Sequence, residues 1–329
     1  MGKGKIDFIM TWVDGNDEDW LKEKSKFAAS KLEDDRNIRF RNWDNLEYWF
    51  RGVENFAPWV NKIYFVTWGH IPDWLNTDHP KLEVVNHKDF IPEKNLPTFS
   101  SHTIELNLHR IDGLSEQFVY FNDDIFITNK LKPEDFFKDG LPRDNCVLNA
   151  ITPRIGEFSP ILNKTVSIIN KNFSKKDCIK KNFFKWFNLK YGKLLIRTMC
   201  MLPWKYFTGF YNPHLAVAYK KETFEEVWAK EHEVLERTCS NKFRNNEDVN
   251  QYIFRYWRLV KGEFSPSKSL GRSMRIEDNN ENIINAITQR KYKLICINDA
   301  EFIGDFESAK QDIIKALDFI LPKKSSYEL

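Results

Sequence analysis

The sequence of 329 residues predicts an α/β fold, with a mainly parallel sheet and a helical, basic insertion. Up to about residue 130, short runs rich in β-branched and aromatic residues alternate with segments of helical period, which is typical of a parallel sheet covered by helices. A stretch dense in lysine and aromatic residues follows before strands and helices resume. We therefore divide the chain into an N-terminal part (1–130) and a C-terminal part (213–329) of one α/β domain, with an insertion or subdomain (131–212) between them.

Each strand is predicted from a short apolar run bounded by polar or turn residues. We expect strands at 6–13, 62–68, 82–87, 117–123 and 293–299. The helices follow from apolar residues repeated every three to four positions. We expect helices at 17–31, 43–56, 100–111, 221–236, 246–259 and 306–320. In the third of these, Ile104, Leu108 and Ile111 form one apolar face that can lie on the sheet, and Gly113 then turns the chain.

Composition and charge limit the class of protein. Hydrophobic residues make up 42% of the chain, which is enough for a folded core. The net charge of only +3 excludes a chain whose main partner is nucleic acid. The five cysteines are an odd number without a CxxC pair, which favours a reducing compartment. No window approaches the roughly eighteen uninterrupted apolar residues of a spanning helix, so we expect a cytoplasmic protein.

Three apolar runs end in acidic or amide side chains. In chain order these are Asp14 and Asp17 around Gly15, then Asn122, Asp123 and Asp124, then Asn298 and Asp299. Ligands of open α/β sheets bind at the carboxyl ends of the strands, where loops and helix N-termini converge. The adjacent carboxylates of Asp123 and Asp124 repel each other, and a hard divalent cation, Mg²⁺ or Mn²⁺, would relieve that repulsion. The alternative is that the two acids only cap a turn.

Two histidines and two arginines stand in contexts that fit catalysis or binding. His102 lies in the first turn of a predicted helix and His214 follows a proline, so either could be a general base with a pKa near neutrality. Arg244 precedes a predicted helix, where its guanidinium could hold a phosphate, and Arg39 precedes another. The alternatives are structural histidines and arginines in surface ion pairs.

The predicted insertion contains a strongly basic segment at 171–205, with ten lysines and arginines against the single acid Asp177. The apolar residues that recur there at spacings of three to four are Ile179, Phe183, Phe187, Tyr191 and Leu194. A helix with this pattern would be amphipathic with a cationic face. It would either lie on an anionic membrane or pack on the core with its lysines solvated, and both interpretations stay open.

Four ordered blocks of the sequence resemble the Stealth family of sugar-phosphate transferases. The first block is "IDFIMTWVDGNDEDW" and the second spans residues 39 to 128, including "FVYFNDDIFI". The third runs from "NPHLAVAYKKE" through "KFRNNEDVNQYIFRYW", and the fourth is "LICINDAE". Together they cover about half of the chain in one order, which makes chance similarity improbable.

The resemblance implies transfer of a hexose 1-phosphate, commonly an N-acetylhexosamine 1-phosphate, from a UDP-sugar to a hydroxyl group of an acceptor glycan. The products would be a phosphodiester and UMP, in the synthesis of capsular or surface polysaccharide. It also implies a nucleotide-sugar-binding sheet resembling GT-A or Rossmann-like folds. The acceptor could be lipid-linked, which would place the enzyme at the inner face of the membrane.

The resemblance assigns roles to particular residues. It implies catalytic or phosphate-binding roles for His214, Arg244 and Asp299, and metal binding for Asp123 and Asp124. His102 is a second candidate base, but the animal branch of the family can carry proline at that position, so we prefer His214. We expect the substrate to be bound by Asp14, Gly15, Asp17, Arg39, Asn122 and Asn298. Two alternatives are a metal-dependent glycosyltransferase that releases UDP and a non-catalytic module that binds nucleotide sugars or glycans.

Overall fold

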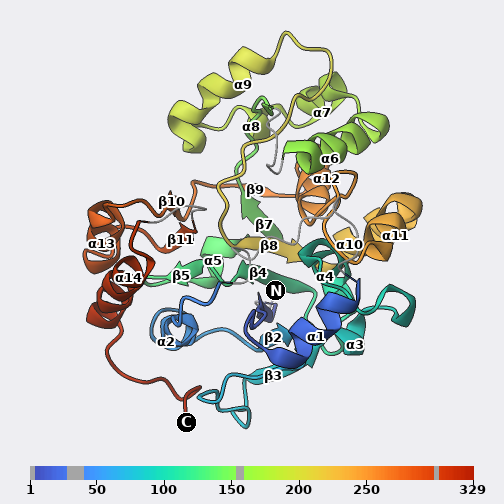
Figure 1. The fold of residues 1–329 in the computed structure, drawn as a ribbon. Coiled ribbons are helices and arrows are strands. Elements are labelled where there is room, and N and C mark those ends of the chain that lie inside the picture. Colours follow the sequence, from blue (N-terminus) through green and yellow to red (C-terminus); the bar gives the residue numbers. More distant parts are fainter. Residues whose placement is uncertain (1–3, 28–40, 153–158, 300–303) are drawn as a thin grey trace.

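A five-stranded sheet of order β3-β2-β1-β4-β8 forms the centre of the computed structural model, which describes residues 4–27, 41–152, 159–299 and 304–329 (Figure 1). The strands are β1 (Ile6–Thr11), β2 (Ile63–Thr67), β3 (Leu82–Asn86), β4 (Gln117–Asn122) and β8 (Val217–Lys220). Strands β1 to β4 are parallel, and β8 runs antiparallel to β4. The α/β class and the mainly parallel sheet are therefore confirmed.

The direction in which successive strands are added to the sheet reverses beside β1, and this reversal determines where a ligand can bind. From β1 the chain adds β2 and β3 on one side and then crosses to add β4 on the other. Thr11 at the end of β1 is paired with Asn122 at the end of β4. Such a switch point opens a crevice at the carboxyl ends of the two strands, where ligands bind in open α/β sheets.

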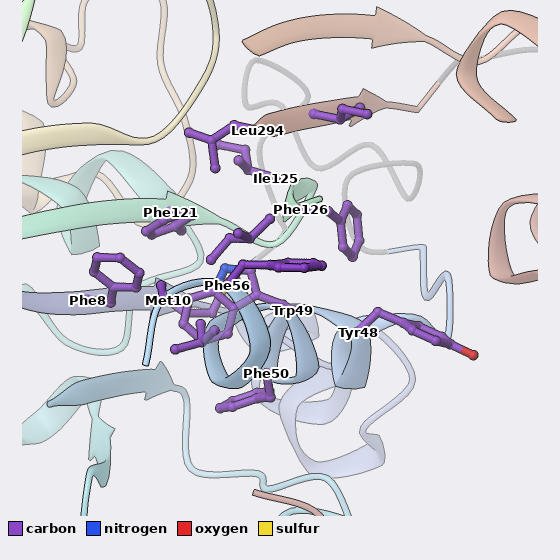
Figure 2. Close-up of a cluster of buried hydrophobic side chains, with 14 of the residues drawn as sticks. Phe8, Met10, Tyr48, Trp49, Phe50, Phe56, Phe121, Ile125, Phe126 and Leu294 are labelled. Carbon is purple, nitrogen blue, oxygen red and sulfur yellow. The ribbon is translucent and has the colours of Figure 1, made fainter. Parts of the chain in front are cut away.

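The sheet has a separate apolar core on each face, because successive side chains of a strand point to opposite sides. Phe8 and Met10 of β1 belong to one core, and Ile9 between them belongs to the other. Figure 2 shows the first core, in which Phe8, Phe121 and Trp49 pack side by side. Burial on both faces explains why these strands read as continuous apolar runs.

Helices cover both faces. The first core is closed by α2 (Leu46–Phe56), α13 (Glu281–Thr288) and α14 (Phe306–Ile320). The second is closed by α4 (Ser101–Asn107), α6 (Ser159–Asn172), α10 (Lys221–Lys230), α11 (His232–Ser240) and α12 (Tyr252–Lys261). Three further helices are α1 (Glu18–Phe27), α3 (His87–Phe90) and α5 (Pro133–Phe136). Within the described ranges, no helix combines the length and the apolar character needed to cross a bilayer.

Two small sheets join distant parts of the chain. One consists of β10 (Gly271–Arg275), β11 (Leu294–Asn298) and β5 (Ile125–Ile127), and the other of β6 (Phe137–Lys138), β7 (Leu141–Asp144) and β9 (Ser265–Pro266). Strand β5 follows β4 after a two-residue turn and pairs antiparallel with β11. The C-terminal strand is thereby brought beside the end of β4.

Several predicted helices agree with the structure and two need correction. The helix at 306–320 has the predicted bounds, while the described part of the first helix is Glu18–Phe27 and its predicted end at 28–31 lies outside the described residues. The helix predicted at 221–236 is two helices that meet at Glu231, whose buried carboxylate accepts hydrogen bonds from Lys171 and Asn172. These contacts favour a break at that point rather than a continuous helix.

The helix predicted at 246–259 begins only at Tyr252. The preceding residues form a turn, because the carboxylate of Asp248 accepts hydrogen bonds from the Asn245 backbone at 2.8 Å and from the Asn241 side chain at 2.7 Å. Asp248 therefore stabilises the turn before the helix and does not lie in its first turn.

The basic segment is also not one amphipathic helix. It forms α7 (Lys175–Lys181), α8 (Phe183–Trp186), a 3₁₀ turn (Leu189–Leu194) and α9 (Leu195–Met201). Gly192 in the 3₁₀ turn has a φ of 54°, a left-handed conformation that interrupts any regular helix. The domain boundaries at 130 and 212 stay a prediction.

Candidate active site

A cavity of about 640 Å³ lies where the strand ends converge. Thr11, Trp12 and Val13 line it from the end of β1, and the chain beyond β4 and β11 lines it from two further sides. Of the residues predicted for a site, those that line this cavity are Asn122, Asp123, Asp124, His214, Arg244, Asn298 and Asp299. Residues more than one hundred positions apart in the sequence therefore meet in one polar cavity.

The two adjacent carboxylates form the turn that links β4 to β5. The carbonyl of Asp124 accepts a hydrogen bond of 2.8 Å from the Ile297 backbone, which fixes the turn against β11. The side chain of Asp123 is exposed to the cavity, and the surrounding cavity walls partly desolvate its carboxyl. This desolvation and the neighbouring charge of Asp124 raise the pKa of Asp123 to about 7. The pair is therefore electrostatically strained when both acids are ionised.

Asp124 connects the turn to a histidine and a cysteine. Its Oδ2 lies 3.3 Å from His214 Nε2 and accepts a hydrogen bond of 3.2 Å from the thiol of Cys296. Donor atoms of these three residues all lie within 4.8 Å of one another. The cluster thus combines an oxygen, a nitrogen and a sulfur ligand, with Asp124 and His214 lining the cavity and Cys296 fully buried beside them.

The backbone of His214 is held in an unusual conformation. Its φ is 48°, which is rare for a residue with a side chain. Two residues earlier, the amide oxygen of Asn212 accepts a hydrogen bond of 2.7 Å from Arg255, and Arg255 is in turn paired with the buried Asp144. This network positions the segment that carries the imidazole.

The charges around His214 act on its pKa in opposite directions. Burial alone would lower that pKa, but the hydrogen bond and the negative charge of Asp124, together with Glu105, outweigh burial and raise it. The imidazole is therefore partly stabilised in its charged form.

Two arginines reach the cavity from different elements. Arg244 donates a hydrogen bond of 2.7 Å to the hydroxyl of Ser101, the first residue of α4. Arg41 donates a hydrogen bond of 3.2 Å to Asp299, and the indole of Trp43 donates another of 3.2 Å to the same carboxylate. Cationic groups thus lie on the wall of a cavity that also contains carboxylates.

Other predicted residues lie away from the cavity wall. The side chain of Asp14 accepts a hydrogen bond from the Asn16 backbone, and that of Asp17 accepts one of 2.7 Å from the Trp20 backbone, so both order the loop around Gly15. His102 is fully buried, with Nδ1 3.1 Å from Asp248 Oδ2. Arg39 lies outside the described residues. The roles assigned to these residues stay predictions.

Sequence reasoning missed two residues of the cavity region. Glu105 lies in α4 and accepts hydrogen bonds from Tyr120 and the Gln251 backbone, and burial raises its pKa. The sequence offered a signal for Glu105, because a carboxylate within a helix that is expected to pack on the sheet is a candidate functional residue. Cys296 stands two positions before Asn298, so strand alternation places both side chains on the same face of β11.

Comparison with known proteins identifies the family. Residues 4–31 match the family model described as "Stealth protein CR1, conserved region 1", and residues 39–144 match "Stealth protein CR2, conserved region 2". A capsular polysaccharide phosphotransferase, WcwK, of Streptococcus pneumoniae is 46% identical over 98% of both chains. A receptor polysaccharide phosphotransferase, WefC, of Streptococcus gordonii is 40% identical over 99% of both chains.

A third relative is an exopolysaccharide phosphotransferase, cps2G, of Lactiplantibacillus plantarum, which is 39% identical over 99% of this chain and 97% of its own length. Among solved structures, the galactosyltransferase LgtC with donor and acceptor sugar analogues is similar at a TM-score of 0.39 and 11% identity, over 97% of this chain and 98% of that chain.

These matches define the protein as an enzyme of the phosphotransferase class. It belongs to the Stealth family, as the sequence blocks predicted. A non-catalytic binding module, one of the two alternatives from the sequence, is therefore set aside.

Proposed function

We propose that this enzyme transfers a hexose 1-phosphate, commonly an N-acetylhexosamine 1-phosphate, from a UDP-sugar to a hydroxyl group of an acceptor glycan, with release of UMP, in capsular or surface polysaccharide synthesis. The observation that carries the proposal is the cavity at the switch point between β1 and β4, which brings Asp123, Asp124, His214 and Arg244 together. The names of the bacterial relatives support a polysaccharide acceptor. The cavity volume falls in the usual range for small-molecule sites, about 300 to 1,000 Å³.

The side chains at the end of β4 fit a hard divalent cation. Asp124 Oδ1 and Asn122 Oδ1 are buried and have no hydrogen-bond partner among the described residues, and both are oxygen atoms of the kind that Mg²⁺ and Mn²⁺ prefer. Asp123 and Asp124 would hold the ion. When bound, it would neutralise charge on the diphosphate.

His214 is suited to accept the proton of the acceptor hydroxyl. Its Nε2 faces Asp124, which leaves Nδ1 as the ring nitrogen available to act as the base. The hydroxyl oxygen would form a bond to the β-phosphorus of the donor as the bond from that phosphorus to the bridging oxygen breaks. The electron pair of the broken bond leaves with UMP, and the product is a phosphodiester.

Arg244 is suited to the negative charge that develops during this displacement. Its guanidinium is held by Ser101 at the first residue of α4, at the cavity wall. A fixed cation at that place would stabilise the equatorial oxygens of the transferred phosphoryl group without reorganising during the reaction. Arg41 is similarly fixed by Asp299 and could contact the remaining phosphate.

The test is the identity of the released nucleotide. Purified protein with Mg²⁺ is incubated with single UDP-hexoses and UDP-N-acetylhexosamines, with and without glycan acceptors, and the nucleotide is separated by chromatography. We expect acceptor-dependent UMP from a UDP-N-acetylhexosamine and a product containing a phosphodiester. Release of UDP would instead mean attack on the anomeric carbon, the reaction of a glycosyltransferase, and would overturn the proposal.

A further inference from the structure

The surface formed by residues 176–206, which we call the apical face, exposes an unusual amount of apolar area. Eight of the thirteen large apolar side chains that are exposed in the described part of the chain lie in this segment. The most exposed of these eight side chains are Leu189 at 88% and Phe184 at 83%, followed by Ile196 at 62%. Figure 1 shows this segment, around α8 and α9, at the opposite end of the molecule from β2 and β3. Such patches on soluble proteins usually mark interaction sites.

The apical face is built into the fold. On the inner side of α9, the hydroxyl of Thr198 is buried and accepts a hydrogen bond of 3.1 Å from the Leu148 backbone. The buried ammonium of Lys175 donates hydrogen bonds to the carbonyls of Met201 and Trp204 and so fixes the loop after α9. Because the inner side is anchored in this way, Met199 and its apolar neighbours are held outward.

The apical face also exposes cationic side chains. Lys176, Lys180, Lys181 and Lys193 are exposed, and none of them forms an ion pair with any other described residue. The only acid between 171 and 205 is Asp177. Two of the basic residues expected on the cationic face belong elsewhere, because Lys175 and Lys185 direct their ammonium groups to backbone carbonyls. The remaining lysines still leave the face strongly positive.

We propose that the apical face binds the surface of an anionic phospholipid bilayer. Exposed lysines are attracted to anionic headgroups, and the exposed aromatic rings of Phe184, Trp204 and Tyr206 suit the boundary between headgroups and acyl chains. A protein partner fits less well, because lysine is depleted in protein interfaces. Docking in this way would hold the enzyme at the membrane independently of its donor specificity.

Vesicle flotation tests this surface directly. The purified protein is mixed with vesicles of phosphatidylcholine containing phosphatidylglycerol, or of phosphatidylcholine alone, and the bound fraction is measured over a lipid titration. We expect binding only to the anionic vesicles. The double variant K180Q/K181Q should bind about 25-fold more weakly, since each lysine near such a surface contributes about fivefold. Added salt should weaken binding of the wild-type protein.

A matched pair of variants separates the apical face from exposed apolar residues in general. Phe184→Ser with Leu189→Ser should lower vesicle affinity at least about tenfold. Phe319→Ser removes another strongly exposed ring, at 72% exposure, from α14 and should leave binding unchanged. Circular dichroism melting confirms that each variant is folded.

Three results would overturn the proposal. They are equal binding to both kinds of vesicle, an effect of Phe319→Ser as large as that of the apical variant, and no vesicle binding by the wild-type protein. A concentration-dependent dimer that Phe184→Ser abolishes, without vesicle binding, would assign the face to a second copy of the chain instead.

Discussion

Asp124 Oδ2 and His214 Nε2 lie 3.3 Å apart although the two residues are separated by 90 positions in the sequence. One belongs to the turn after β4 and the other to the loop that leads into β8, the strand that pairs with β4. Because β4 and β8 are antiparallel neighbours, the end of one lies beside the start of the other. The sheet itself therefore brings the carboxylate and the imidazole into contact.

Replacement of His214 tests its proposed role as the general base. We expect His214→Asn to lower kcat by about 100- to 10,000-fold, the usual range for loss of a general base, with a small change in KM for the donor. The measurement is the rate of UMP release at saturating substrates. His232→Asn is a matched control, because His232 is exposed at the start of α11. A kcat of His214→Asn above about one tenth of the wild-type value would contradict this role.

Replacement of the paired carboxylates tests the metal assignment. We expect Asp123→Asn and Asp124→Asn each to raise the Mg²⁺ concentration needed for half-maximal activity by at least about tenfold, since each removes an anionic oxygen ligand. Magnesium titration of the initial rate measures this change. Asp73→Asn, at an exposed aspartate, serves as the control. An unchanged Mg²⁺ requirement in both variants would place the cation elsewhere.

The mixed ligand cluster predicts sensitivity to zinc. Asp124, His214 and Cys296 offer one oxygen, one nitrogen and one sulfur atom, all of which bind Zn²⁺, whereas Mg²⁺ prefers oxygen alone. We expect added Zn²⁺ to inhibit the enzyme, and Cys296→Ser to raise the inhibitory concentration at least about tenfold. The exposed Cys200 provides the control variant Cys200→Ser. Equal Zn²⁺ sensitivity of the two variants would show that the cluster is not where zinc acts.

The buried ion pairs of Asp144 predict a stability that depends on pH. Asp144 accepts hydrogen bonds of 2.8 Å from Arg255 and 2.6 Å from Arg258, and all three side chains are nearly inaccessible. Removing the carboxylate leaves buried charges unpaired, so we expect Asp144→Asn to lower the free energy of unfolding by about 3 to 5 kcal/mol near pH 7. Urea unfolding at that pH measures the loss, again with Asp73→Asn as the control.

The sign of the pH effect follows from the pKa of Asp144. Burial alone would raise that pKa, but Arg255 and Arg258 lower it below its usual value. The ion pairs therefore stabilise the protein above the unfolded pKa of about 3.9 and lose that effect as pH falls through the lower folded pKa. The difference in the free energy of unfolding between the wild-type protein and Asp144→Asn should therefore become smaller in acid. A difference that stays constant below about pH 4 would contradict this account.

The strands and the outline of the site could be predicted because both depend on local patterns. Asp123 and Asp124 stood out as charges at the end of a buried apolar run. The pairing of Thr11 with Asn122 could not be predicted, because the local sequence does not indicate which strands are neighbours in a parallel sheet. The contact of Asp124 with Cys296 was missed for the same reason, because it depends on β5 pairing with β11.

The errors in the helices and in the basic segment have a different cause. Aspartate is common both at the start of a helix and in turns. The contacts of Asp248 with Asn245 and His102 stabilise the turn. Lys175 looked like a surface charge, yet its ammonium is buried against backbone carbonyls. In each case a polar side chain found a partner that only the folded chain provides.

The pairing of β5 with β11 also has a consequence for synthesis. Until the residues of β11 have emerged from the ribosome, the turn that carries Asp124 lacks the hydrogen bond from Ile297 that fixes it. The carboxylates after β4 are translated early but would gain their final geometry only when almost all of the chain has emerged. A nascent chain that stalls before Leu294 would therefore lack the strand against which this turn is fixed.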